Sequence, residues 1–361
     1  MSAEPSPSAV PTFESRVHGC LLGGALGDSL GYAVEFDSIN AIRSRYGTAG
    51  LTSFGQLDGG SHFSDDTQMT LYTVDGLVEA LEWANDGVAA DETACLWLAY
   101  LRWLATQGVP LPASAPVPQP RWIDGQDVLR HRRDPGSACL SGLATGDMGT
   151  VARPVNPDSK GCGTVMRSAP FGLVPHIPEA AVYRLSAAAA SLTHGHPSAR
   201  QSAAAFSLLV HKLATGSDVR TAAEHALSVV EALPDPAPEL LERLRQALIL
   251  SATGTLLNPE ELTAQLGEGW VAEEALAVGL YSVLATEATA DVQLDPAAHF
   301  RRAIGVALNH SGDSDSTASI AGNILGALHG EAALPADWLE ALEAPDVIRG
   351  MAQRLIAVTV G

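Results

Sequence analysis

Apolar residues recur at three- and four-residue spacing along most of this 361-residue chain, whereas alternating runs rich in Val, Ile and Thr are scarce. Such spacing brings apolar side chains onto one face of a helix, so it predicts helices rather than strands. Gly, Pro, Asn, Asp or Ser bounds each clear example. These examples cover residues 92–107, 179–193, 197–215, 219–233, 238–252, 271–286 and 296–308. We therefore expect an all-α protein.

The stretch Ala181–Leu192 is apolar almost all round, which is typical of a helix buried on every side. It favours one compact, multilayered helical domain, which we expect to span residues 15–361. Residues 1–14 contain several Pro and Ser and lack the basic and apolar blocks of a signal peptide, so we expect a flexible leader there. The Pro-rich stretch 108–120 predicts an extended surface loop within the domain.

Composition excludes several classes of protein. A hydrophobic content of 46% is enough for a sizeable core and argues against disorder. The net charge of −20 provides no positive field for nucleic acid or anionic lipid, and no apolar run reaches the ~20 residues of a membrane span. The cysteines are dispersed without zinc-site spacing, which favours the reducing cytoplasm. They are Cys20, Cys95, Cys139 and Cys162.

Glycines at four-residue spacing mark the first predicted helix, and they put a smooth stripe on one of its faces. The stripe consists of Gly19, Gly23, Gly27 and Gly31. Close packing against another helix is its simplest explanation. Asp28 and Glu35 lie two helical turns apart on one face. We expect Asp28 to be a structural carboxylate and Glu35, just before a break, to project into a cleft.

Two further segments place hydroxyl and carboxylate groups at predicted helix starts. They contain Ser64, Asp65 and Asp66 in one and Asp313, Asp315 and Ser316 in the other. Helix capping explains one or two of these residues. Four carboxylates with several hydroxyls form the oxygen ligand set of Mg²⁺ or Mn²⁺, and clustering them is costly unless cations neutralise the charge. A two-metal site would serve a phosphatase, a nuclease or a glycosidase, so these residues alone predict a metal-assisted hydrolase.

Five motifs in order narrow this prediction. They are G-D-S-L-G-Y-A-V-E, S-D-D-T-Q-M, G-C-G-T-V-M-R-S-A-P at 161–170, L-T-H-G-H-P at 192–197 and G-D-S-D-S-T-A-S-I-A-G. Together they resemble the ADP-ribosylglycohydrolase family from about Arg16 to about Gly330. The resemblance implies a compact orthogonal multi-helix bundle with a central cleft for two Mg²⁺ or Mn²⁺ ions. It assigns metal ligation to Ser64, Asp65, Asp66, Asp313, Asp315 and Ser316, and catalysis to Glu35 and Asp65.

The resemblance also implies a substrate-binding side of the cleft. It assigns ADP-ribose binding to Gly161, Cys162, Gly163, Met166 and His194. Cys162 departs from the family pattern, in which asparagine stands at that position, so recognition of the ribose or diphosphate differs there. For His194 the residues leave two interpretations open, a core histidine or a contact near the diphosphate. Arg167 is expected to be a buried structural arginine rather than a phosphate ligand.

The implied activity is metal-dependent hydrolysis of the N- or O-glycosidic bond that links ADP-ribose to a protein side chain, with arginine the favoured acceptor. The expected partner is an ADP-ribosylated protein or a small molecule that contains ADP-ribose, and a cytoplasmic monomer is expected. Two alternatives stay open. One is hydrolysis of another acceptor, such as serine, a nucleobase or a small molecule; the other is a non-catalytic, crystallin-like or ADP-ribose-binding protein.

Overall fold

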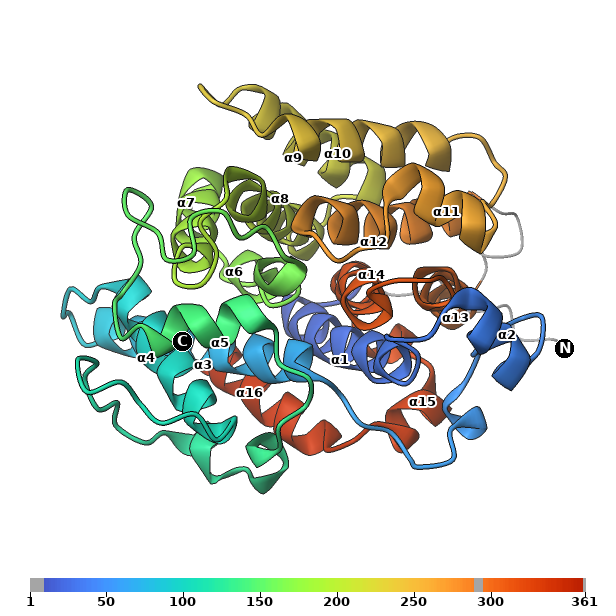
Figure 1. Cartoon of the computed structure of the whole chain (residues 1–361). Coiled ribbons are helices and arrows are strands. Elements are labelled where there is room, and N and C mark those ends of the chain that lie inside the picture. Colours follow the sequence, from blue (N-terminus) through green and yellow to red (C-terminus); the bar gives the residue numbers. More distant parts are fainter. Residues whose placement is uncertain (1–9, 289–294, 360–361) are drawn as a thin grey trace, which may run out of the picture.

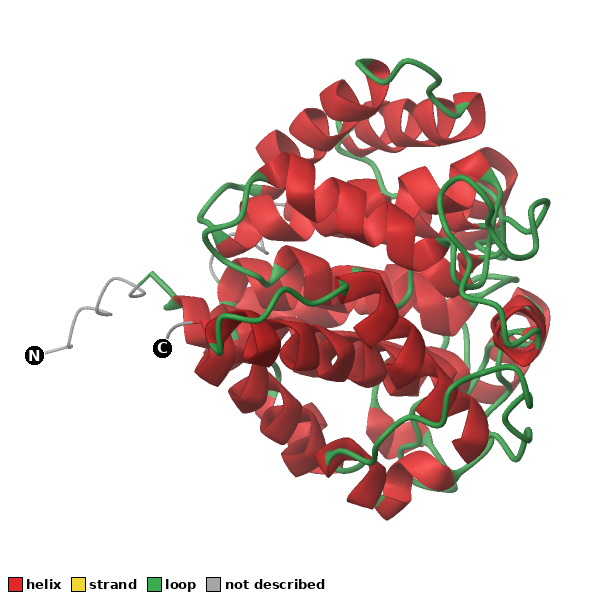
Figure 2. Cartoon of the chain, turned by 90° about the vertical axis from the view of Figure 1, so that its left-hand side faces the viewer, coloured by secondary structure: helices red, strands yellow, loops and turns green. Residues whose placement is uncertain are grey.

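The computed structural model describes residues 10–288 and 295–359, and helices and loops account for this part of the chain (Figure 2). The described residues contain no strand; the one β feature among them is an isolated bridge between Gly161 and Val271. The prediction of an all-α fold is therefore confirmed. None of the helices within these ranges is long and apolar enough to cross a membrane.

All the helices predicted from apolar spacing are present, and their ends lie within a few residues of the predicted ones. They are α4 (Glu92–Thr106), α7 (Glu179–Ala190), α8 (Pro197–Ala214), α9 (Val219–Glu231), α10 (Pro238–Ser251), α12 (Ala272–Glu287) and α13 (Pro296–Leu308). Three begin with proline at the first helical position, where its missing N–H costs nothing. The side chains of Asp91, Asp218 and Asp295 cap α4, α9 and α13.

The remaining helices complete a layered bundle. They are α1 (Phe13–Tyr32), α2 (Ile39–Tyr46), α3 (Asp65–Asn85), α5 (Ser137–Ala144), α6 (Ala169–Gly172), α11 (Pro259–Leu266), α14 (Ser314–His329), α15 (Ala336–Ala341) and α16 (Pro345–Thr359). In Figure 1, α9 and α10 lie outermost at the top, α12 lies below them, and α14 and α1 follow at the centre with α16 beneath. Buried apolar side chains from these layers form one connected core.

Helices α1 and α14 pack against each other through backbone rather than side chains. A Cβ atom added to Gly23 would lie 2.4 Å from the carbonyl oxygen of Gly322, and one on Gly27 would lie 2.0 Å from that of Ala318. Neither glycine can therefore carry a side chain unless the helices move apart. The stripe has the packing role that its spacing predicted, and it brings the end of α1 beside the start of α14.

The charged Arg16 side chain stabilises the opposite end of this helix pair, where α14 ends. Although Arg16 is buried, its guanidinium donates hydrogen bonds to the carbonyl oxygens of Leu213, Ala327 and Leu328 at 2.7–3.0 Å. Two of these carbonyls belong to the last turn of α14, where no intrahelical donor remains for them. The guanidinium therefore holds the C-terminal end of α14 against α1 and α8.

The expectation for residues 181–192 was wrong in one respect. Helix α7 buries only the face that contains Val182, Ser186 and Ala189, whereas Arg184 is exposed. Alanine presents little apolar area to water, so an alanine-rich face can lie at the surface at small cost. The loop 108–120 runs over the surface without regular structure, as predicted. Residues 1–9 of the predicted leader lie outside the described residues, and α1 begins at Phe13.

Candidate functional site

One cleft, of about 360 Å³, collects the chemistry-bearing residues from distant parts of the chain. All the predicted site residues except Ser64 line it: Glu35, Asp65, Asp66, Gly161, Cys162, Gly163, Met166, His194, Asp313, Asp315 and Ser316. Two larger surface hollows, on α10 and beside the loop 108–120, contain no comparable group of carboxylates. The cleft is therefore the candidate site.

The first cluster lies at the start of α3. Ser64 is the N-cap residue, and its hydroxyl accepts a hydrogen bond from the backbone N–H of Asp66 at 3.1 Å. Asp65 and Asp66 occupy the first turn, where the helix dipole favours negative charge. One Asp65 carboxylate oxygen accepts a hydrogen bond from the backbone N–H of Gly136 at 3.1 Å. Ser64 is fully buried behind the two aspartates and does not line the cleft.

The second cluster lies at the start of α14, and Asp313 is its N-cap. Gly312, with φ of +151°, precedes the cap, and a Cβ there would lie 2.1 Å from the Glu268 carbonyl oxygen. Only glycine fits this approach. The backbone N–H of Asp313 donates to the same Glu268 oxygen at 2.9 Å, and the turn aims Asp313 and Asp315 into the cleft.

Hydrogen bonds join the two clusters and brace them from behind. The Ser316 hydroxyl donates to an Asp66 carboxylate oxygen at 2.9 Å, which connects α14 to α3. Asp28, fully buried on α1, accepts hydrogen bonds from the backbone N–H groups of Ser64 and Thr67 and from the Thr67 hydroxyl. Asp28 thus positions the start of α3, which agrees with the structural role predicted for it.

Negative charge is concentrated and poorly hydrated in this cleft. Burial raises the pKa of Asp65, Asp66 and Asp313 well above the usual value for a carboxyl group, and neighbouring carboxylates raise it further. Burial, and then the charges of Asp315 and Asp313, raise the pKa of Glu35 to about 10. Oε2 of Glu35 is buried and has no hydrogen-bond partner.

These features provide a test of whether the residues fit divalent cations. Among the described residues no group of three or more His, Cys, Asp or Glu side chains is arranged as a ready metal site. The chemistry of the donor set nevertheless fits: carboxylate and hydroxyl oxygens are the ligands of Mg²⁺ and Mn²⁺. Bound cations would also offset the mutual repulsion of the carboxylates and offer a partner to the unpaired Glu35 oxygen.

The glycine loop forms the opposite wall of the cleft. The backbone N–H of Cys162 donates to the Trp270 carbonyl oxygen at 3.2 Å, and Gly161 forms its bridge with Val271 next to that contact. A Cβ on Gly163 would lie 2.9 Å from Sγ of Cys139, so the loop packs closely there. The Cys162 thiol donates to an Asp313 carboxylate oxygen at 2.7 Å. Cys162 therefore contacts the carboxylate cluster.

His194 is a buried histidine that also lines the cleft. It is 2% exposed, yet it lines the cleft beside Gly161 and Gly163. Its Nδ1 contacts the Thr193 hydroxyl at 2.8 Å, and burial together with the Arg167 charge lowers the pKa of His194 to about 3. A neutral imidazole can present Nε2 to a ligand without adding charge.

Arg167 does not line the cleft. It is buried, its guanidinium donates to the Thr193 hydroxyl at 2.7 Å, and it lies 4.4 Å from the centre of the Tyr100 ring. These contacts are internal, and they agree with the structural role expected for it.

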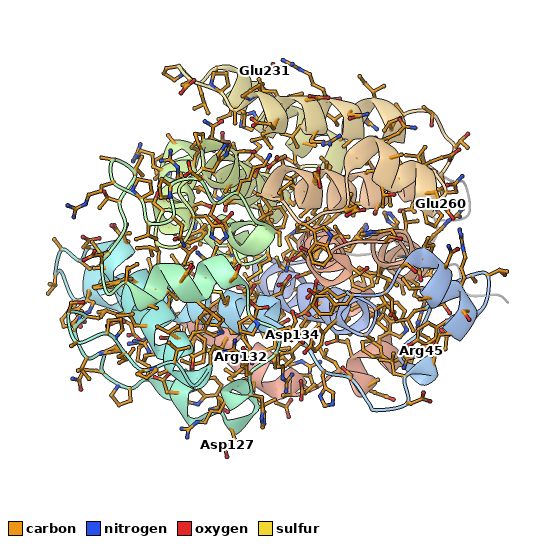
Figure 3. The ribbon with its side chains drawn as sticks, in the orientation of Figure 1. Arg45, Asp127, Arg132, Asp134, Glu231 and Glu260 are labelled. Carbon is orange, nitrogen blue, oxygen red and sulfur yellow. The ribbon has the colours of Figure 1, made fainter. Side chains whose placement is uncertain are left out.

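The cleft also contains residues that the sequence did not single out. They include Phe36, Asp134, Gly136, Cys139, Ser159 and Trp270. Asp134, labelled near the middle of the view in Figure 3, precedes Pro135 and Gly136, and this turn sequence just before α5 was an available signal. Nothing in the sequence alone brings Trp270, in the loop before α12, to the same cleft.

Comparisons with known proteins agree with this architecture. The sequence model of the ADP-ribosylglycohydrolase family matches residues 9–361. An ADP-ribosyl-[dinitrogen reductase] glycohydrolase of Rhodospirillum rubrum is 25% identical, with 92% of each chain covered. ADP-ribosylhydrolase ARH3 of Danio rerio is 24% identical, with 98% of this chain and 94% of that protein covered. A solved ADP-ribosylglycohydrolase-related protein complex contains a chain with the same fold, at a TM-score of 0.63 and 22% identity over 96% of this chain and 99% of that one.

Proposed function

The chain belongs to the ADP-ribosylglycohydrolase family, and on that basis we propose that it hydrolyses the N- or O-glycosidic bond joining ADP-ribose to a protein side chain, with divalent cations and with arginine as the favoured acceptor. One observation carries the proposal. The end of α1 and the starts of α3 and α14 bring Glu35, two pairs of aspartates and the glycine loop into a single cleft. A structural protein has no need of five buried carboxyl groups in one hollow.

The surroundings of the carboxyl and hydroxyl groups indicate which role each of them would have. The four aspartates and the Ser316 hydroxyl, which line the cleft, would hold divalent cations there, and Ser64 would support them from behind as the N-cap of α3. Such cations would orient the hydroxyls of the ribose next to the scissile bond and stabilise charge as that bond loosens. We assign to Asp65 and Asp315 the task of holding those cations in position. Asp65 is held for this by the backbone N–H of Gly136.

Glu35 is the group we assign to proton transfer. Burial and the neighbouring Asp315 carboxylate raise the pKa of this carboxyl group, and this favours its protonated form. In the protonated form it can donate a proton to the nitrogen or oxygen of the departing side chain as the bond to the ribose carbon breaks. The resulting carboxylate can then accept a proton from the water whose oxygen bonds to that carbon. The glycine loop and neutral His194 line the wall on which the rest of ADP-ribose would lie.

Release of ADP-ribose from an arginine-ADP-ribosylated protein tests the proposal. With Mg²⁺ or Mn²⁺ the wild type should release ADP-ribose, and Asp65→Asn and Asp315→Asn should reduce the rate by at least about a hundredfold. Asp86→Asn, at the exposed far end of α3, is the matched control and should retain the wild-type rate. Wild-type activity in the Asp65 and Asp315 variants, or full activity with a chelator present, would contradict the metal assignment.

Serine-linked and base-linked ADP-ribose, assayed in parallel, would separate the favoured acceptor from the alternatives. No release from any of the three, with ADP-ribose still bound, would indicate a binding protein instead.

A further inference from the structure

We propose that Phe36, Trp270 and Asp134 form an acceptor subsite at the mouth of the cleft, and that this subsite binds a guanidinium group. The inference rests on the proposed function, since it specifies the leaving group of that reaction. It concerns three residues that line the cleft but belong neither to the carboxylate cluster nor to the glycine loop.

Two aromatic rings meet at this mouth from separate parts of the chain. The rings of Phe36 and Trp270 stack with centroids 6.2 Å apart and planes 18° from parallel. Phe36 is 70% exposed and Trp270 is 40% exposed. An isolated exposed aromatic residue needs no explanation, but a stacked pair lining a cleft presents a flat apolar face to whatever enters it.

Both rings belong to segments that adjoin the carboxylate cluster. Phe36 directly follows Glu35, the residue we assign to proton transfer at the scissile bond. Trp270 follows Gly269, where a Cβ would lie 3.3 Å from Cβ of Asp313. Both rings are therefore anchored next to the groups that would act on the bond between ribose and acceptor. We place the acceptor side chain on this side of the scissile bond.

Asp134 adds negative charge to the same mouth. It is exposed, it has a φ of +48°, which is uncommon for a residue other than glycine, and the Tyr32 hydroxyl donates to its Oδ2 at 2.8 Å. The neighbouring cations are engaged elsewhere: Arg133 pairs with Glu343, and Arg132 donates to the Gln107 carbonyl oxygen. No ion pair of Asp134 occurs among the described residues, so its carboxylate is available to a ligand.

A flat apolar face and an unneutralised carboxylate together match a guanidinium group. A guanidinium is planar and cationic, stacks on aromatic rings and donates two parallel hydrogen bonds to a carboxylate. A serine hydroxyl offers neither a plane nor a charge. Asp134 is not among the residues assigned to the cations, so its carboxylate would repel the diphosphate of ADP-ribose, and the subsite suits the acceptor better than the nucleotide.

Agmatine, a small guanidinium compound, is a direct probe that needs no catalysis. Its dissociation constant for the full chain with Mg²⁺ is measured by saturation-transfer NMR, and that of ADP-ribose by calorimetry. Phe36→Leu, Trp270→Leu and Asp134→Asn should each weaken agmatine binding about tenfold and leave ADP-ribose binding unchanged. Trp83→Leu, which removes another exposed tryptophan on α3, is the matched control and should change neither constant.

Three results would overturn the inference: no agmatine binding by the wild type, unchanged agmatine binding in the ring variants, or a loss of ADP-ribose affinity instead, which would mean that the rings stack on adenine. Hydrolysis measured on arginine- and serine-linked ADP-ribose separates this inference from the proposed function. If the wild type releases arginine-linked ADP-ribose and the variants keep its preference over serine, the subsite is wrong and the function stands. If the ring variants lose agmatine but the wild type hydrolyses neither linkage, the function is wrong and the subsite stands.

Discussion

Replacing Gly27 by alanine should destabilise the protein, although alanine is the better helix former. The new Cβ would lie 2.0 Å from the carbonyl oxygen of Ala318, whereas a carbon and an oxygen approach no closer than about 3.3 Å. The obstacle is backbone, which cannot rotate away, so α1 and α14 must separate by about 1.3 Å. Overpacking of this kind costs about 3 kcal/mol, and the higher helix propensity returns about 1 kcal/mol. We expect a net loss of about 2 kcal/mol.

Thermal unfolding followed by far-UV circular dichroism, with a chelator present, measures this loss. For a chain of this size 2 kcal/mol corresponds to a fall in melting temperature of about 3 °C. Gly305→Ala is the matched control, because Gly305 lies inside helix α13 and a Cβ there would meet no atom within 4 Å. Propensity acts alone at that position, so this variant should melt about 1 °C higher than the wild type.

A Gly27→Ala variant that melts at or above the wild-type temperature would refute the reasoning, since it would mean that the two helices can separate without loss. The same variant should also respond less to added Mg²⁺, because the displaced α14 carries Asp313 and Asp315 at its start.

Three further predictions concern Asp28, Arg167 and Cys162. In the absence of metal, the melting temperature should fall as the pH rises from 5 to 7. The free energy of unfolding should decrease by about 1.4 kcal/mol per pH unit for one buried carboxyl group such as Asp28. Burial and the charge of Asp315 raise the pKa of Asp28 to about 7, so in this window the folded chain holds a proton that the unfolded chain has already lost; a flat or rising profile would contradict this. Arg167→Lys should lower the free energy of unfolding by about 2 kcal/mol, because the bond to Thr193 and the stacking on the Tyr100 ring are lost, and should leave KM unchanged; a raised KM with normal stability would mean a substrate contact. Cys162→Asn should tighten Mg²⁺ binding a few-fold, seen as a larger Mg²⁺-induced rise in melting temperature, because an amide oxygen suits a hard cation better than a thiol beside Asp313; an equal response would show that the thiol stays out of the site.

Local physics explains why much of the fold could be predicted from the sequence. Helix starts such as Pro197 and Pro296 depend on neighbours a few residues away, so their capping signals can be recognised from the sequence alone. The apolar stretch at 181–192 misled because burial depends on what packs against a helix, and the side of α7 that contains Arg184 faces water.

The candidate site also contains residues that local sequence signals predict and residues that only the packing of the helices brings together. Asp65 and Asp313 lie at helix starts that capping residues make recognisable in the sequence, and both belong to the motifs that resemble the family. Phe36 and Trp270 come together only because the segment after α1 and the loop before α12 meet at one rim. No local pattern contains that contact, since it depends on how all the intervening helices pack.

The glycine stripe and the placement of Glu35 are two consequences of one antiparallel register. Gly23 faces Gly322, Gly27 faces Ala318 and Gly31 faces Ser314, so each step of four residues toward the end of α1 is matched by a step of four back toward the start of α14. Continuing this register by one more step brings Glu35 beside the turn that carries Asp313, where the charges of Asp313 and Asp315 act on its carboxyl group. The small residues at 318, 322 and 326 repeat the spacing of the first stripe, so the pairing was present in the sequence as two complementary patterns. A helix contact that looks purely structural therefore sets the distance between the proton-transfer residue and the carboxylates, and substitutions in the stripe should disturb the chemistry as well as stability.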